Sequence, residues 1–210
     1  MNTSSFWFFE SVLTPRFCDE VIKYGLSKKE NLGNIANTGK KTLDEEKIND
    51  LKKIRNSNVV WLNDAWIYKE IHHYIHEANK KAGWNFQWDW SEDCQFTKYK
   101  LNQYYDWHRD TFDHPFNCPE NKNQHGKIRK LSVTCQLSDV SDYEGGELEF
   151  DFRDYNPTKR DESLHVIRTE KILKKGSIIV FPSYIWHRVK PVLKGTRYSL
   201  VIWNCGYPFK

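Results

Sequence analysis

Hydrophobic residues recur with a helical period in two early segments of the chain. The first segment follows Thr14-Pro15, an N-cap and a proline at the first helical position. Its apolar residues repeat at helical spacing: Phe17, Val21, Ile22 and Leu26. The second segment, about residues 64–82, carries an apolar stripe and ends before Gly83: Ile67, Ile71, Ile75 and Ala78. Two amphipathic helices are therefore predicted.

After Gly83 the hydrophobic period changes from 3.6 to 2, which is typical of half-buried strands. Predicted strands cover 95–101, 104–110, 131–137, 148–152, 177–181, 186–189 and 197–203. Helices followed by many short strands predict an α+β fold, an antiparallel β-sandwich or jelly roll with the N-terminal helices packed on one sheet. Three polar segments are predicted to be loops, and the sequence does not indicate their function: residues 30–50, 113–128 and 154–169.

Composition changes this picture little. The 210 residues are 39% hydrophobic and 15% aromatic, enough for one sizeable core, so we expect a single domain over 1–210. Residues 1–90 would form a helical buttress with the first strands, and 91–210 the jelly-roll core. No apolar run approaches the roughly 18 residues of a membrane span, and the N-terminus does not resemble a signal peptide.

Cysteines and charge favour a cytoplasmic protein without nucleic-acid partners. The five cysteines are scattered, lack a Cys-x-x-Cys pair and fit reduced, packed thiols better than disulfides. The net charge of +4 comes from dispersed lysines, whereas a nucleic-acid footprint would concentrate them.

One histidine and one aspartate stand two residues apart in a predicted strand. His108 and Asp110 would project from one face of residues 104–110, where together they can chelate a divalent metal. A His-x-Asp pair is weak evidence alone, and without further matching residues an ordinary polar strand end would be the better explanation. His187, at the end of an apolar segment, would complete a two-histidine, one-carboxylate triad suited to non-haem Fe(II).

An arginine follows His187 by ten residues, across the turn 191–195. If the two flanking strands pair as a hairpin, Arg197 returns close to His187. A buried arginine beside a metal requires an anion, and a dicarboxylate that chelates iron at one end would supply it. Pairing with a local acid is the alternative.

Further motifs surround these residues. His187 begins the sequence His-x-Val-x-Pro-Val-x-x-Gly-x-Arg-x-Ser-Leu, and Gly145-Gly146-Glu147-Leu148 forms a second motif. Arg55-Asn56-Ser57 precedes Trp61-Leu62, and Leu13-Thr14-Pro15 opens the first helix. Together with His108-Arg109-Asp110 they resemble the Fe(II)/2-oxoglutarate-dependent dioxygenases, particularly the prolyl 4-hydroxylase-like branch. The resemblance extends over most of the chain.

The resemblance implies a cofactor set and a reaction. Fe(II) would be held by His108, Asp110 and His187, with 2-oxoglutarate and O₂ as co-substrates and ascorbate as a supporting reductant. Arg197, Ser199 and Tyr99 would meet the distal carboxylate of 2-oxoglutarate. The aromatic residues Tyr105, Trp107 and Trp203 would line the substrate cleft. The expected reaction is hydroxylation of a C–H bond with release of succinate and CO₂.

A prolyl residue in a peptide or protein is the most specific substrate implied by the resemblance. Two alternatives remain open. The same chemistry could act on a free amino acid, another small metabolite or a nucleobase. The chain could also be a non-catalytic β-sandwich binding module with a relic site, although four retained site residues speak against it.

Overall fold

The two predicted helices are confirmed. The computed structural model describes residues 4–32, 54–153, 156–157, 167–168 and 174–209. Helix α1 (Pro15–Leu26) begins where the Thr14 hydroxyl accepts a 3.1 Å hydrogen bond from the Phe17 N–H. Helix α3 (Ala65–Lys81) ends before Gly83, whose φ of 77° suits glycine. Within the described ranges, neither helix is long and apolar enough to cross a membrane.

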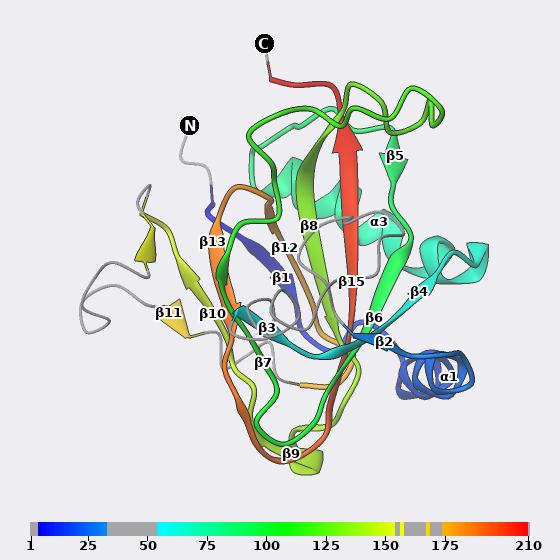
Figure 1. Ribbon diagram of the computed structural model, residues 1–210, viewed down its shortest axis with the longest axis vertical. Helices are drawn as coiled ribbons and strands as arrows, with labels where there is room; N and C mark the ends of the chain where they lie inside the picture. Colours follow the sequence, from blue (N-terminus) through cyan, green and yellow to red (C-terminus); the bar gives the residue numbers. More distant parts are fainter. Residues whose placement is uncertain (1–3, 33–53, 154–155, 158–166, 169–173, 210) are drawn as a thin grey trace, which may run out of the picture.

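Antiparallel strands form two large sheets that face each other and a separate two-stranded sheet (Figure 1). The order in the larger sheet is β1 (Trp7–Phe9), β12 (Ile178–Pro182), β8 (Ile128–Gln136), β15 (Arg197–Gly206), β6 (Cys94–Tyr99), β4 (Asn58–Leu62) and β2 (Asn31–Leu32), with β5 (Trp90–Ser91) beside β15. The order in the smaller sheet is β11 (Ile167–Arg168), β10 (Leu148–Asp151), β13 (Trp186–Val189), β7 (Tyr104–His108) and β3 (Arg55–Asn56). The predicted jelly roll in an α+β fold is confirmed.

The larger sheet turns its apolar face toward the helices. Side chains alternate along each strand, and those on the helix side join α1 and α3 in one buried cluster, among them Phe96, Val133, Cys135, Ile178, Leu200 and Ile202. The opposite face, inside the jelly roll, carries buried polar residues from three adjacent strands: Gln95, Thr97, Ser132, Gln136, Arg197 and Ser199. The helices therefore bury the apolar face, and the interior face is left for polar groups.

The predicted hairpin between the strands that carry His187 and Arg197 is wrong. Strand β13 pairs with β10 and β7 in the smaller sheet, whereas β15 pairs with β6 and β8 in the larger one. The residues between them form β14 (Val192–Gly195), which pairs with β9 (Tyr143–Gly145) after the short helix η1 (Val140–Asp142). Because β14 carries the chain from one sheet to the other, Arg197 reaches the interior from the side opposite His187.

The predicted loops are only partly visible. Most of 30–50 and of 154–169 lies outside the described residues. Residues 113–128 form a series of turns that lead into β8. Backbone hydrogen bonds of 2.9 Å from Phe116 N–H to Lys127 O and from Gly126 N–H to Phe116 O close this loop at its base.

We expect Gly25→Ala in α1 to destabilise the protein. In an ordinary helix this change stabilises by up to about 1 kcal/mol, but here the new Cβ would lie 2.5 Å from Cδ1 of the Phe96 ring. Overpacking typically costs about 1–3 kcal/mol. Urea unfolding should therefore show a lower free energy of unfolding. Lys23→Ala on the exposed side of the same helix is the control, and an increase in stability for Gly25→Ala would contradict the packing.

Candidate metal centre

Three potential metal ligands meet between the two sheets. His108 ends β7, and His187 lies directly opposite it on β13. Asp110 follows His108 by two residues, with its carboxylate 3.7 Å from His108 Nε2 and 3.4 Å from His187 Nε2. The ligand atoms of the three residues lie within 4.8 Å of one another, and no other such group occurs in the described part of the chain. One divalent ion fits between them.

Backbone carbonyls orient both imidazoles. His108 Nδ1 lies 2.7 Å from the carbonyl oxygen of Asp106, and His187 Nδ1 lies 2.9 Å from that of Ile185. Because a carbonyl only accepts, each Nδ1 carries the proton, which leaves the Nε2 lone pair directed at the Asp110 side. Metal-binding histidines are commonly oriented in this way.

Asp110 is not part of the strand, contrary to the predicted extent of 104–110. Strand β7 ends at His108, and Asp110 lies in the bend that follows. Its N–H donates to the carbonyl of Ser183 at 2.9 Å, and its carbonyl accepts a 3.3 Å hydrogen bond from Arg129 Nη1. Contacts from two other segments, rather than the pleat of β7, therefore bring Asp110 beside His108.

The protonation states suit a metal. Burial holds the pKa of His108 well below its ordinary value, and the adjacent His187 adds to this effect. Burial by itself would raise the pKa of Asp110, but His187, His108 and Arg129 outweigh it and lower this pKa. A neutral imidazole beside an ionised carboxylate is the combination that binds a divalent cation.

A buried arginine faces the same interior from the larger sheet. Arg197 is 1% exposed and lies opposite Tyr99 in the β15–β6 register. Within the described residues its buried Nε and Nη1 have no hydrogen-bond partner. Gly146 passes so close that a Cβ there would lie 3.1 Å from Arg197 Cδ. Two unused donors on a buried cation fit a carboxylate-bearing ligand.

The other two residues expected to bind the co-substrate also face this interior. The guanidinium carbon of Arg197 lies 5.6 Å from the centre of the Tyr99 ring. Ser199 follows Arg197 on the same face of β15, opposite Thr97 and Gln136. All three predicted residues thus share one face, while their contacts to 2-oxoglutarate remain a prediction.

Tyr105, expected in the substrate cleft, lies against the metal site. Its ring stacks on the His108 imidazole with a centroid distance of 3.4 Å and an interplanar angle of 10°. The guanidinium carbon of Arg55 lies 4.5 Å from the centre of the Tyr105 ring. Burial raises the pKa of Tyr105 to about 12, so its hydroxyl stays protonated at neutral pH.

Trp107, expected to line the substrate cleft, lies on the outer face of the smaller sheet, away from the candidate metal ligands. Between the pairs Tyr105–Val189 and His108–His187, two residues of β7 oppose one of β13. This bulge turns Trp107 to the outer face of the smaller sheet, where its ring lies 4.6 Å from the guanidinium of Arg188. Arg188 alternates with His187 along β13 and therefore also points away from the ligands.

Trp203 does face the interior. It lies opposite Ser132 on β8, and its ring is covered by the Arg129 guanidinium at 3.9 Å. Its buried Nε1 has no hydrogen-bond partner among the described residues. Trp61 from β4 lies 6.0 Å from it and is 47% exposed. The two indoles form an apolar wall that extends from the interior to the surface.

The sequence profile of the 2OG-Fe(II) oxygenase superfamily matches residues 94–205. This stretch is more than half of the chain and includes His108, Asp110, His187 and Arg197. The chain belongs to the 2OG-Fe(II) oxygenase superfamily. Membership implies Fe(II) as the cofactor and 2-oxoglutarate and O₂ as co-substrates.

Curated relatives of this oxygenase include PKHD-type hydroxylases. The protein from Synechococcus sp. (strain CC9902) is 38% identical over 103 residues, which are 49% of this chain and 36% of that protein. The protein from Idiomarina loihiensis is 30% identical over 106 residues, 50% of this chain and 38% of its own length. The matched part thus spans little more than a third of these relatives.

Solved structures share the fold of this oxygenase. The viral collagen prolyl hydroxylase of Paramecium Bursaria Chlorella virus-1 has a TM-score of 0.62 at 21% identity, with 97% of both chains covered. A prolyl hydroxylase of Trichoplax adhaerens, solved with a peptide fragment of hypoxia inducible factor, has a TM-score of 0.67 at 18% identity. The match covers 97% of this chain and 84% of that one.

Two residues of the oxygenase site escaped sequence reasoning. Burial raises the pKa of Tyr143 and the nearby Arg197 charge opposes this rise, whereas Arg129 donates a hydrogen bond to the carbonyl of Asp110. Both lie far from the ligands in sequence, and Tyr143 begins the three-residue strand β9, which has no distinctive pattern. For Arg129 a signal existed, since it is a charged residue at the start of a strand that is otherwise largely buried.

We expect the metal-free oxygenase to lose stability as the pH falls below about 6.5, the ordinary pKa of histidine. Because the folded protein lowers the pKa of His108, the unfolded chain binds more protons in this range, so stability rises with pH. Urea unfolding at pH 7, 6 and 5 with a chelator measures the slope.

His108→Gln should flatten that slope, since glutamine does not titrate. The control is His114→Gln, which changes an exposed histidine and should leave the slope as in wild type. Equal slopes for His108→Gln and wild type would contradict a neutral, buried His108.

Proposed function

We propose that this protein is an Fe(II)- and 2-oxoglutarate-dependent dioxygenase that hydroxylates a prolyl residue of a peptide or protein. The observation that carries the proposal is the pairing, in one interior, of the His108–Asp110–His187 group with the partnerless donors of Arg197. A metal ion would bind the three-residue group, and a dicarboxylate bound to that metal would pair with Arg197. A simple binding module would need neither the metal-binding group nor the unpaired buried donors.

His108, Asp110 and His187 would hold the iron through two Nε2 atoms and one carboxylate oxygen. When bound, the iron supplies the redox chemistry that couples decarboxylation of 2-oxoglutarate, to succinate and CO₂, with hydroxylation of a C–H bond. The protein keeps the ligands in their binding protonation states. It also surrounds them with rings that exclude water, including Phe150 and Phe181, which both lie near His187.

Arg197 would bind the distal carboxylate of 2-oxoglutarate with Nε and Nη1. The charge of the co-substrate then neutralises a guanidinium that is otherwise buried without an acid in hydrogen-bond contact. Tyr99 and Ser199 lie beside it on the same inner face, where their hydroxyls are available to the same carboxylate. Arg197 thereby orients the co-substrate, with its keto-acid end toward the metal ligands.

A prolyl substrate is supported by the PKHD-type and prolyl hydroxylases to which the chain is similar. The indoles of Trp61 and Trp203 provide flat apolar surfaces against which a pyrrolidine ring can pack. All five cysteines are free thiols, which agrees with a reducing compartment such as the cytosol. A peptide or protein partner therefore fits better than a nucleic acid.

The direct test is product analysis by mass spectrometry. The protein is incubated with Fe(II), 2-oxoglutarate, ascorbate and a panel of proline-containing peptides. We expect a peptide product heavier by one oxygen atom, located on proline, with one succinate formed per product. Asp110→Ala, which removes the carboxylate ligand, should form neither product.

Other outcomes separate the alternatives. If a free amino acid or nucleobase is oxidised and no peptide is, the dioxygenase chemistry is retained but the proposed prolyl substrate is wrong. No succinate with any substrate, in protein that also fails to bind Fe(II), would identify a non-catalytic module.

We expect Arg197→Met to weaken 2-oxoglutarate binding about ten- to a hundredfold. Charge-assisted hydrogen bonds contribute about 1.5–3 kcal/mol, and methionine retains the packing volume without the charge. Calorimetric titration of 2-oxoglutarate into Mn(II)-loaded protein gives the affinity, and a separate Mn(II) titration should remain near wild type. Undiminished 2-oxoglutarate affinity would assign Arg197 another role.

A further inference from the structure

A second arginine, largely but not fully buried, lies close to the metal ligands. The side chain of Arg129, at the start of β8, is 13% exposed. Its Nε and Nη2 donate to the two carboxylate oxygens of Glu92 at 2.5 and 2.7 Å, a bidentate ion pair with an acid that is equally buried. Its charge is thus already balanced, unlike that of Arg197, and it has no need of a ligand.

The remaining nitrogen of Arg129 reaches the metal site. Nη1 donates to the main-chain carbonyl of Asp110 at 3.3 Å. The guanidinium carbon of Arg129 lies over the Trp203 indole, 3.9 Å from the ring centre. This cation–π contact orients the guanidinium. The ion pair therefore ends at the backbone of a candidate metal ligand.

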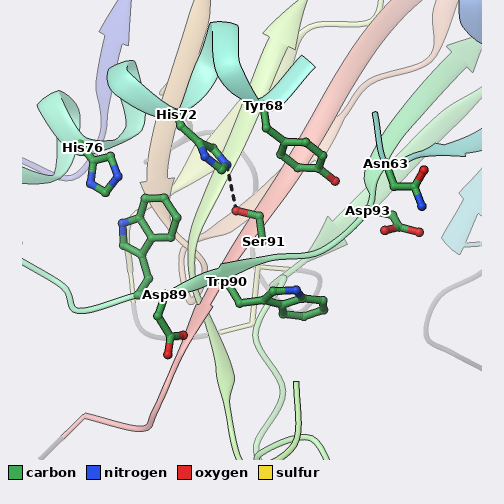
Figure 2. A pocket seen from close by; sticks show the side chains of 9 residues that line it. Asn63, Tyr68, His72, His76, Asp89, Trp90, Ser91 and Asp93 are labelled. Carbon is green, nitrogen blue, oxygen red and sulfur yellow. Dashed lines mark hydrogen bonds between the residues drawn. The ribbon is translucent and has the colours of Figure 1, made fainter. Parts of the chain in front are cut away.

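Glu92 is itself held firmly, from the side of α3. Its N–H donates to the carbonyl of Trp203 at 3.0 Å, and its own carbonyl accepts from the Tyr68 hydroxyl at 2.9 Å. Figure 2 shows the preceding residue, Ser91, joined to His72 of α3, a contact of 3.1 Å. The segment that carries Glu92 is thereby anchored to the helix.

The same segment forms the wall of a surface hollow of about 560 Å³ below α3 (Figure 2). Its lining includes Tyr68, His72, Trp90 and Ser91, and none of the candidate metal ligands. Glu92 does not line this hollow, and its carboxylate pairs with Arg129. A continuous set of contacts thus runs from α3 through Glu92 and Arg129 to Asp110.

We propose that Arg129, held by Glu92, is a positioning residue that fixes the backbone of Asp110 and so directs its carboxylate at the metal. Asp110 lies beyond the end of β7 and has no strand pairing of its own. The Ser183 carbonyl holds its N–H, and Arg129 holds its carbonyl. This inference rests on the proposed function, since it concerns the metal bound there.

The rival explanation is an ion pair that serves stability alone. Removing one partner of a buried pair leaves an uncompensated charge and destabilises for that reason, so single variants do not separate the two roles. Arg129→Met combined with Glu92→Met removes both charges at similar volume, which is often neutral or stabilising.

Metal affinity and stability should therefore separate in this double variant. We expect its urea unfolding to recover relative to Arg129→Met alone. Its Mn(II) affinity should remain reduced at least tenfold, as is typical when a contact that orients a ligand is lost. The measurement is Mn(II) titration of the full chain followed by electron paramagnetic resonance, without turnover. Mn(II) affinity equal to wild type would overturn the positioning role.

Two further variants serve as a control and as a second test. Lys98→Met with Glu30→Met removes a comparable ion pair of 2.7 Å on β6 and should bind Mn(II) like wild type. Arg129→Lys keeps the charge but not the planar fork, and provides a second variant if the double variant does not fold. Its Mn(II) affinity should also fall, and an unchanged value would overturn the inference.

Asp110→Ala distinguishes failure of this inference from failure of the proposed function. If wild type binds Mn(II) and Asp110→Ala does not, the metal centre stands, and the double variant then decides the role of Arg129. If wild type and Asp110→Ala bind Mn(II) equally, the metal centre is elsewhere and both proposals are overturned.

Discussion

The rest of this structure depends on the two-sided character of the larger sheet. Its strands alternate so that apolar side chains such as Phe96, Val133 and Leu200 face α1 and α3. Because the helices bury that face, the interior of the jelly roll can accommodate polar residues that a simple sandwich would not tolerate. Burying an arginine, a serine and a glutamine there costs free energy unless their polar atoms are hydrogen-bonded. The helices thus make possible a polar interior that can hold a metal and a dicarboxylate.

The interior balances its charges in two different ways. Arg129 is neutralised within the protein by Glu92, so this ion pair can act as a rigid support. Arg197 has buried donors that no described residue satisfies, which suits the co-substrate carboxylate that we propose for it. Asp110 lies between these cases, since its charge is stabilised by two histidines that would bind the same metal. In this proposal, affinity for the co-substrate and geometry of the metal site depend on different arginines.

Sequence patterns predicted the helices and most strands because each depends on neighbours within one segment. The period of Ile67, Ile71 and Ile75 is visible without knowledge of what they pack against. The residue types at positions 108, 110, 187 and 197 can bind a metal and a carboxylate, but they indicate that chemistry only as a group. Family resemblance supplied their grouping, and the structure brings the three ligand atoms within 4.8 Å of one another.

What lay beyond the sequence were relations between distant segments. The bulge that turns Trp107 outward comes from the pairing of β7 with β13, which no local pattern specifies. Arg197 enters from the opposite sheet because β14 pairs with β9, and Arg129 meets Asp110 because β8 pairs with β12, after which the Ser183 carbonyl holds Asp110. The sequence by itself determined which chemical groups exist and which face of each helix or strand is apolar. Tertiary structure decided which groups meet, because strand pairing and register join residues that are far apart in the chain.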